Sequence, residues 1–384
     1  GSRDDGGAKP RKLVDGIVNA FAPSTDDANL GYLVFLRDAI GGGVGTPPIG
    51  TLTAQRFDLR KLESIGEPVP LSDRTVAFAS ASRTGVLAFV RAPGEIGDQL
   101  TIFDRQGKLV KTVGAPGMYG DLAISPDQTR VAVDRIDPKT GNLDIWTFDV
   151  ANGKGSAVTN DFWPDFNPVW LPDGKRLAYV SVRTETSGIY EKPSDGTGVE
   201  ELVFRHTPGA TDRATDWSPD GKFLAFSDGA MSMIPLRPGE KATDRKSMEW
   251  LAADYEVWDG RFSPDTRYFA YSTNEADVFR YEVFVRPFDA SKTEAPDPAV
   301  QVSKDGIRGS ESRDRDGTVD INWRRDGKEL YFVSRKMEVT AVDVTTTPAL
   351  KAGTPKVLFR LDGLISDGGS LDGQRFVFLM PVRK

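Results

Sequence analysis

Three carboxylates with a glycine turn among them form the pattern in this sequence that most resembles a metal site. Asp314, Asp316 and Asp320 are spaced around Gly317. Such spacing can fold carboxylate oxygens around a hard cation such as Ca²⁺, although the distal glutamate of a complete EF-hand loop is missing. Aspartate and glycine are also ordinary residues of polar turns. We therefore expect a solvated loop here, with calcium binding by these aspartates as the alternative.

Cysteine and histidine chemistry has almost no residues to work with. The chain has no cysteine, and His206 is its only histidine. The sequence therefore has no disulfide, thiolate nucleophile or sulfur-ligated zinc. One histidine cannot form a multi-histidine metal site either. We expect His206 to be a solvated loop residue.

The nucleophile motif of serine hydrolases, G-x-S-x-G, does not occur in the chain. Residues 368–372 come nearest, but the last position is Asp372 instead of glycine. Ser370 is better explained as a turn residue. Because no nucleophile, base or metal cage converges, we predict that the protein is not an enzyme and that it has no catalytic residue and no cofactor.

Six further aspartates recur with a regular spacing, and each stands in a turn signature. Proline sets φ for the second turn position, aspartate bonds to its own backbone, and glycine supplies a positive φ, so the chain reverses between two antiparallel strands. We therefore assign these aspartates to turns and not to catalysis. They are Asp127, Asp173, Asp220, Asp265, Asp326 and Asp372.

A short apolar strand follows most of these turns, and it recurs at intervals of about 45 residues. An extended segment ending in an aromatic residue precedes several turns and predicts an innermost strand, as at 168–170 and 321–323. A third strand and a weaker, more polar fourth strand complete each unit, as at 145–149 and 200–204. The eight copies of the apolar strand are centred near residues 34, 88, 132, 178, 225, 270, 331 and 377.

Four antiparallel strands in about 45 residues is the blade of a β-propeller. We predict an all-β fold, a single propeller of eight four-stranded antiparallel blades, with seven as the alternative. The propeller is expected over residues 11–384. Residues 1–10, which open with a Gly-Ser pair typical of a cleaved tag, are expected to be a flexible N-terminus.

The last copy has only a turn and a second strand before the chain ends. The blade of this last copy needs an outer strand from elsewhere, and Arg11 to Val14 are our candidate. Such pairing would join the N- and C-terminal strands in one blade. Two units are longer than the others because of insertions at 39–50 and 304–317. Face loops of propellers often carry function, so we expect contacts there.

Tryptophans stand near the ends of the expected innermost strands, at Trp170, Trp217 and Trp323. They could stack on a sugar or peptide at the mouth of the channel. Their regular position favours packing between blades instead.

The amino-acid composition limits the classes of partner that the protein can bind. The 384 residues have 39% hydrophobic and 27% charged side chains, which suits a globular protein with a large core. The net charge of −7 and the absence of a basic run argue against nucleic acid. No apolar stretch is long enough to cross a bilayer, so we expect no membrane contact. A protein or peptide partner and a monomeric state are our expectation.

The strand-turn-strand hallmark at 217–226 resembles the TolB-like, WD40-like (PD40) propellers. Residues 31–37, 66–70, 323–330 and 372–376 are similar to the C-terminal propeller regions of bacterial, especially acidobacterial, serine/threonine protein kinases. No kinase signature occurs in this chain. The resemblance implies a sensor or scaffold region, in a periplasmic or other extracytoplasmic location.

Two functions remain open at the level of sequence. The first is a non-catalytic binding, scaffold or sensor propeller that recognises a protein, peptide or small ligand through its face loops and central funnel. The second is a calcium-dependent propeller enzyme, such as a lactonase or glycan lyase. Ligand identity does not follow from the sequence.

Overall fold

The structure is a computed structural model in which nearly every element is a β-strand. A single turn of 3-10 helix, η1 (Ala242–Asp244), is the exception among the described residues. In that part of the chain no helix has the length and apolar character needed to span a bilayer. The structure describes residues 17–23, 29–40, 49–81, 87–91, 97–137, 141–183, 186–205, 213–227, 229–251, 254–277, 280–292, 294–296, 298–307, 321–363 and 367–382.

The chain forms two compact units, residues 1–95 with 138–141 and residues 96–137 with 142–384. The first unit is a five-stranded antiparallel sheet in which each strand pairs with the next along the chain. Alternating apolar residues form its pairs, such as Leu36 opposite Leu52. Its strands are β1 (Ile17–Pro23), β2 (Leu30–Ile40), β3 (Ile49–Asp58), β4 (Glu63–Ala81) and β5 (Leu87–Arg91).

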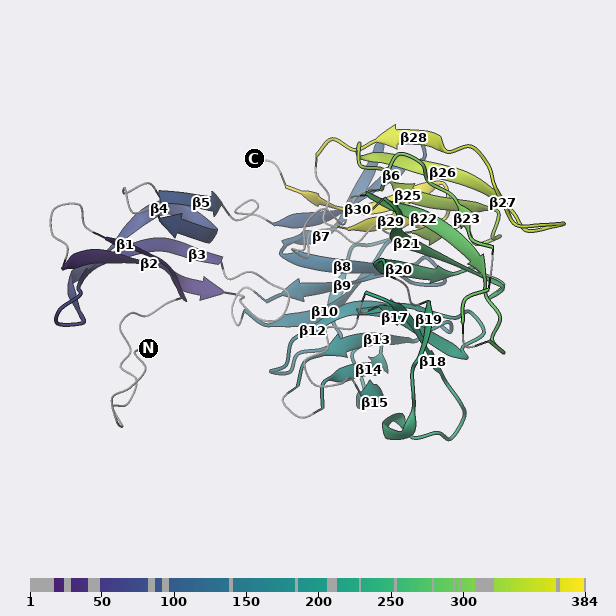
Figure 1. The fold of residues 1–384 in the computed structure, drawn as a ribbon, viewed down its shortest axis with the longest axis horizontal. Coiled ribbons are helices and arrows are strands. Elements are labelled where there is room, and N and C mark those ends of the chain that lie inside the picture. Colours follow the sequence, from purple (N-terminus) through teal and green to yellow (C-terminus); the bar gives the residue numbers. More distant parts are fainter. Residues whose placement is uncertain are drawn as a thin grey trace. The chain divides into compact units, whose positions relative to one another are not determined.

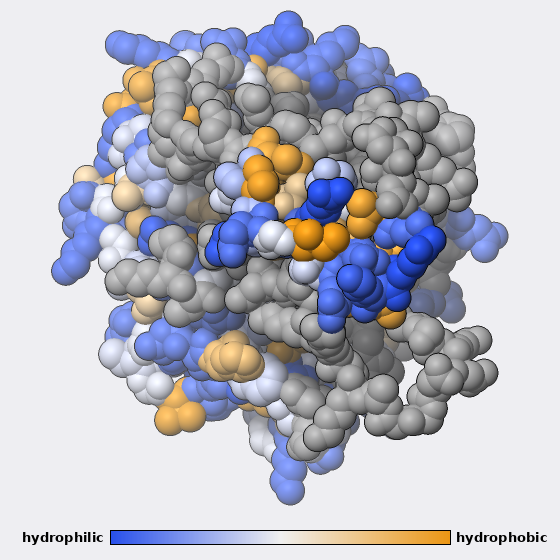
Figure 2. Space-filling model, turned by 90° about the vertical axis from the view of Figure 1, so that its left-hand side faces the viewer, coloured by the Kyte–Doolittle hydropathy of each residue, from blue (hydrophilic) through white to orange (hydrophobic). Residues whose placement is uncertain are grey.

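The sheet of the first unit leaves apolar side chains in solvent. Leu62 is 60% exposed and Val69 is 58% exposed, one before and one within β4. Figure 2 shows hydrophobic residues beside hydrophilic ones on the face drawn. The blades of the second unit instead bury their apolar residues in the clusters between neighbouring sheets.

Within the described residues the second unit contains six antiparallel sheets of four or five strands (Figure 1). The blades are, in turn, β8 (Tyr119–Ile124), β9 (Arg130–Ile136), β10 (Leu143–Asp149) and β11 (Gly155–Ala157); β12 (Asp165–Trp170), β13 (Arg176–Ser181), β14 (Gly188–Pro193) and β15 (Glu201–Arg205); β16 (Arg213–Trp217), β17 (Phe223–Ser227), β18 (Met231–Pro235) and β19 (Met248–Leu251); β20 (Val257–Phe262), β21 (Tyr268–Asp277), β22 (Arg280–Pro287) and β23 (Val300–Gln301); β24 (Asn322–Trp323), β25 (Glu329–Val333), β26 (Glu338–Thr345), β27 (Lys351–Ala352) and β28 (Lys356–Arg360); and β29 (Gly368–Ser370), β30 (Arg375–Pro381), β6 (Asp98–Asp104) and β7 (Leu109–Gly117).

The innermost strands contact one another in cyclic order, β8, β12, β16, β20, β24 and β29, and β29 returns to β8. This closed circuit is a propeller, so the all-β fold with four-stranded antiparallel blades is confirmed. The number of blades differs from our expectation of eight, or seven. The ring has six blades, because the copies centred at 34 and 88 lie in β2 and β5 of the first unit.

The ring closes through β30, which pairs with β6 along its whole length. The end of the chain therefore supplies the two inner strands of the last blade, and β6 and β7 supply the two outer ones. Joining early and late strands in one blade is confirmed, and the early strands in the described part of the chain are β6 and β7. Our candidate, Arg11 to Val14, lies outside the described residues. Leu100 and Ile102 of β6 are fully buried, so β6 covers β30 with the apolar alternation that a blade needs.

The recurring aspartates are turn residues, as predicted. In the blade that begins with β16, the Ser218 hydroxyl donates to Asp220 Oδ1 at 2.7 Å, and the Lys222 backbone N–H donates to the same oxygen at 3.1 Å. Gly221 has φ +74°, the left-handed conformation that glycine adopts at no steric cost. Equivalent backbone N–H groups donate to Asp127, Asp173, Asp265, Asp326 and Asp372.

Tryptophans at the ends of the innermost strands join neighbouring blades. Trp170 is 6% exposed, and its indole N–H donates to the carbonyl of Ala123 in the preceding blade at 3.0 Å. Trp323 repeats this bond to the carbonyl of Arg261 at 3.3 Å. Trp217 is buried in the cluster between its blade and the previous one. The predicted packing role of the three tryptophans is therefore confirmed.

Candidate functional site

A hollow of about 400 Å³, a volume that includes open solvent, lies where the innermost strands of several blades begin. Its walls come from β8, β12, β16 and β20 and from the residue before β29, which are far apart in the sequence. Because these strands surround the axis of the ring, the hollow is the mouth of the central channel. Its polar lining residues are Asp121, Asn167, Arg213, Thr215, Ser227, Trp258, Asp259, Arg261 and Asp367.

Bulges in the innermost strands place polar residues at this mouth. The pairing of β12 with β13 shifts register between Phe166 and Val169, and β20 shifts in the same way between Trp258 and Arg261. Within these shifts Asn167 has φ +57° and Asp259 has φ +47°. Asparagine and aspartate are the residues other than glycine that tolerate this left-handed conformation best. The bulged strand bends and re-aims these side chains, as bulges near binding sites commonly do.

One ion pair crosses the hollow. Arg213 Nη2 lies 2.7 Å from Asp121 Oδ1, and the two residues belong to alternate blades, β16 and β8. Burial disfavours the charged guanidinium, but Asp121 and three further carboxylates more than compensate, and the pKa of Arg213 is raised above its usual value. Arg213 is therefore a permanent positive charge already matched by carboxylates.

Asp134 on β9 joins two blades from behind the hollow. Its Oδ1 accepts a hydrogen bond from the Asp121 backbone N–H at 3.1 Å, and its Oδ2 accepts one from the Asn167 backbone N–H at 3.0 Å. Burial, and secondarily the charge of Asp121, raise the pKa of Asp134 to about 7. Gly120 makes room for this carboxylate, since a Cβ at Gly120 would lie 2.0 Å from Asp134 Oδ1. Asp134 holds the bulges in place.

Two more carboxylates are used for structure. Asp367 accepts the backbone N–H of Leu122 in the adjacent blade at 2.5 Å and that of Gly368 at 2.7 Å. Asp216 on β16 accepts the backbone N–H of Phe262 in the next blade at 2.7 Å. Burial raises the pKa of Asp216 to about 6. Carboxylates thus connect the innermost strands around the channel.

Two side chains at the channel mouth, Asn167 and Asp259, carry hydrogen-bond acceptors that do not connect the innermost strands in this way. Asn167 is 9% exposed, and its Oδ1 has no hydrogen-bond partner among the described residues. Asp259 accepts one hydrogen bond, from the Ser272 hydroxyl to Oδ2 at 3.3 Å. Burial raises the pKa of Asp259, against the attraction of Arg213 and Arg261. Because buried polar atoms are almost always bonded, the free acceptor of Asn167 needs an explanation.

The described residues that line this hollow were not singled out in the sequence as candidate site residues. Asp314, Asp316, Asp320 and His206 lie outside the described residues, as do most of the two insertions. Ser370 is a turn residue, because its hydroxyl accepts the backbone N–H of Gly373 at 2.9 Å. Within the described ranges no three His, Cys, Asp or Glu side chains are placed to hold a metal ion.

Sequence reasoning missed Asp121, Asn167, Arg213 and Asp259. Each lies in the first half of an innermost strand, upstream of the recurring aspartate turn. The signal that could have indicated them is a polar residue early in a segment that ends in an apolar residue. Their convergence itself depends on closure of the ring.

Known proteins share this architecture. The family model of the TolB β-propeller domain, PD40, matches residues 93–286. An uncharacterised protein of Agrobacterium fabrum, Atu1656, is 29% identical over 223 residues, which cover 56% of this chain and 69% of that protein. The Tol-Pal system protein TolB of Hahella chejuensis is 35% identical over 81 residues, covering 20% of this chain and 19% of that protein.

A solved structure, that of a putative TolB from Agrobacterium tumefaciens, superposes with a TM-score of 0.53 at 18% identity. The match covers 76% of this chain and 100% of that one. At this identity the likeness concerns the fold. Because the family model matches half of the chain, this protein belongs to the TolB β-propeller (PD40) family.

Proposed function

We propose that the protein is a non-catalytic binding propeller that recognises a segment of a protein partner at the mouth of its central channel. The observation that carries this proposal is the hollow lined by Asp121, Asn167, Arg213 and Asp259. These side chains stand on strands that are fixed by bonds between blades, so the site is organised in advance. A site of this kind binds without a large ordering cost.

Membership of the TolB β-propeller family agrees with this proposal. The relative from Hahella chejuensis is named Tol-Pal system protein TolB. For this chain we further propose the role suggested by its sequence, a sensor or scaffold region of a receptor-type kinase in an extracytoplasmic location. The acidic net charge of −7 agrees with a partner that is not nucleic acid.

A site-specific photo-crosslinker tests the proposal. Trp258 lines the hollow, and Val199 is 81% exposed in a loop of another blade. A photoreactive phenylalanine derivative replaces either residue, and the two proteins are irradiated in extract from cells that carry the gene. We expect a discrete crosslinked protein from position 258 and none from position 199. Equal labelling at both positions, or none at either, contradicts recognition at the channel mouth.

A further inference from the structure

The mouth of the channel holds more negative than positive charge. Asp121, Asp259 and Asp367 line it, and Asp134 lies directly behind. The guanidinium groups of Arg213 and Arg261 carry the positive charge at the mouth. Arg213 is paired with Asp121, and Arg261 donates to the backbone carbonyls of Thr215 and Gly260. Because both cations already have partners, an anionic ligand would meet an unfavourable field.

Hydrogen-bond acceptors at the channel mouth, by contrast, are available to a ligand. Among the described residues no group donates to Asn167 Oδ1. The Ser272 hydroxyl donates to Oδ2 of Asp259 at 3.3 Å. Asn167 and Asp259 occupy the same position of the bulge in two different blades, and both have positive φ. Backbones held in this sparsely populated region are often found at ligand sites, where the surrounding structure maintains the strain.

An aromatic wall accompanies these acceptors. Trp258 precedes Asp259 on β20 and lines the same hollow. An indole attracts a cation over its face, most strongly where water is partly excluded. Carboxylate, amide oxygen and indole together are a set of groups that recognises a cation with several N–H donors.

We propose that this hollow binds a primary ammonium group, held by Asp259 and Asn167 beside Trp258. This inference rests on the proposed function, because it names the chemical group that the partner would insert. An ammonium is compact and has three donors and no acceptor, which matches the available oxygens. The group could come from a lysine side chain or from a free amino terminus, and both carry the same chemistry.

Three short peptides separate these sources. The first is acetyl-Gly-Gly-Lys-Gly-Gly-amide, the second replaces lysine by norleucine, and the third is Gly-Gly-Gly-Gly-amide with a free amino terminus. Saturation-transfer NMR on the full chain reports which peptide protons contact the protein. We expect binding of at least one ammonium peptide, with Kd about millimolar, and no transfer to the norleucine peptide. Equal transfer to the norleucine peptide, or no transfer to any peptide, overturns the inference.

The variant Asp259→Asn sharpens the test, because asparagine also tolerates φ +47° and the shape of the side chain is kept. It should weaken binding of the ammonium peptide about tenfold. The opposite change, Asn167→Asp, adds a carboxylate and should strengthen it. The matched control is Asp173→Asn, which removes a carboxylate from the turn after β12 and should leave binding unchanged. Equal binding by wild type and Asp259→Asn excludes the proposed site.

Failure of this inference and failure of the proposed function are distinguishable. If crosslinking from position 258 captures a partner while no ammonium peptide binds, the channel mouth is a recognition site for another chemistry and the ammonium inference is wrong. If neither position crosslinks, the proposed function itself is wrong.

Discussion

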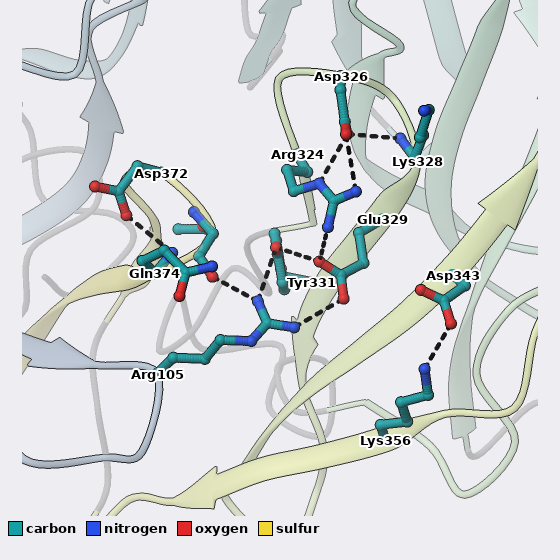
Figure 3. A network of polar contacts seen from close by, with 12 residues as sticks. Arg105, Arg324, Asp326, Lys328, Glu329, Tyr331, Asp343, Lys356, Asp372 and Gln374 are labelled. Carbon is teal, nitrogen blue, oxygen red and sulfur yellow. Dashed lines mark hydrogen bonds and ion pairs between the residues drawn. The ribbon is translucent and has the colours of Figure 1, made fainter.

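Arg105 and Glu329 form an ion pair between the blade that closes the ring and the neighbouring blade, with Arg105 Nη2 2.8 Å from Glu329 Oε1. Arg105 lies in the turn between β6 and β7, and Glu329 begins β25 in the neighbouring blade. The same guanidinium donates to the Tyr331 hydroxyl at 3.2 Å and to the carbonyl of Gly373 in the turn before β30. Figure 3 shows these groups pointing toward one another, so a single side chain connects three elements of the closure.

Arg105→Ala should destabilise the folded protein. The Glu329 side chain is 5% exposed, and it keeps Arg324 and the Tyr331 hydroxyl as partners, each at 2.6 Å. Loss of a hydrogen-bonded partner from a nearly buried carboxylate costs about 1–3 kcal/mol. Urea unfolding monitored by tryptophan fluorescence measures the change. The control is Lys222→Ala, which removes an ion pair with Asp220 in which the lysine side chain is 71% exposed and should produce no measurable loss. Similar losses in both variants would contradict the role of Arg105 in closure.

The pairing of β30 with β6 predicts that a disulfide can be introduced between these two strands. Gln99 of β6 and Met380 of β30 are paired residues, and paired Cα atoms in an antiparallel ladder lie within the range that a disulfide spans. Since the chain has no cysteine, Gln99→Cys with Met380→Cys should form one intramolecular bond on oxidation. Thiol titration and electrophoretic mobility with and without reductant detect it. The pair Val14→Cys with Met380→Cys reports the alternative closure and should stay reduced. The reverse result would show that the N-terminal segment closes the ring.

Replacing Asp165 by a neutral residue should stabilise the folded protein, and the gain should depend on pH. It begins β12, is fully buried, and neither carboxylate oxygen has a partner of normal hydrogen-bond geometry, although the hydroxyls of Ser181 and Thr159 lie nearby. Burial, with a contribution from Asp161, raises the pKa of Asp165 from 3.8 to about 7. The folded state therefore binds this proton more tightly than the unfolded state does. Ionisation then lowers stability progressively between pH 4 and pH 7, and the full cost remains at higher pH.

Asp165→Asn should accordingly match the wild type at pH 4 and exceed its free energy of unfolding by about 4 kcal/mol at pH 8. Urea unfolding at the two pH values measures the difference. The control is Asp326→Asn, because Asp326 accepts hydrogen bonds from Arg324 and its pKa is lowered. A gain for Asp165→Asn that is the same at both pH values would show that its charge does not cause the effect.

Ser218→Ala tests the turn motif. The Ser218 hydroxyl accepts the backbone N–H of Phe223 at 2.9 Å and donates to Asp220, and Ser218 is fully buried. Removal of the hydroxyl leaves a buried N–H without this acceptor, at a cost of about 1–2 kcal/mol. Thermal unfolding should show a lower Tm. Ser291→Ala, whose hydroxyl bonds to Asp289 in an exposed turn, is the matched control and should leave Tm unchanged. A Tm equal to that of the wild type for Ser218→Ala would mean that the proline and glycine alone define the turn.

Local features of the fold could be read from the chain because their causes are local. The turn at 218–221 follows from proline, aspartate and glycine chemistry, and the strand at 223–227 follows from its apolar residues. The predicted outer strand at 200–204 is found within a residue as β15. The count of eight blades failed because the motif of a second strand does not specify which sheet the strand joins.

By itself, then, the sequence determined the strand-turn-strand repeat and the all-β class, since each depends on residues close together in the chain. The packing role of the tryptophans could be predicted because their position recurs with the repeat, although their partners lie in neighbouring blades. The tertiary structure alone decided that β30 pairs with β6 and that Asp121, Asn167, Arg213 and Asp259 meet at one channel mouth. The physical reason is that these contacts join strands from different blades. Their geometry exists only when the ring is complete, so no local propensity encodes it.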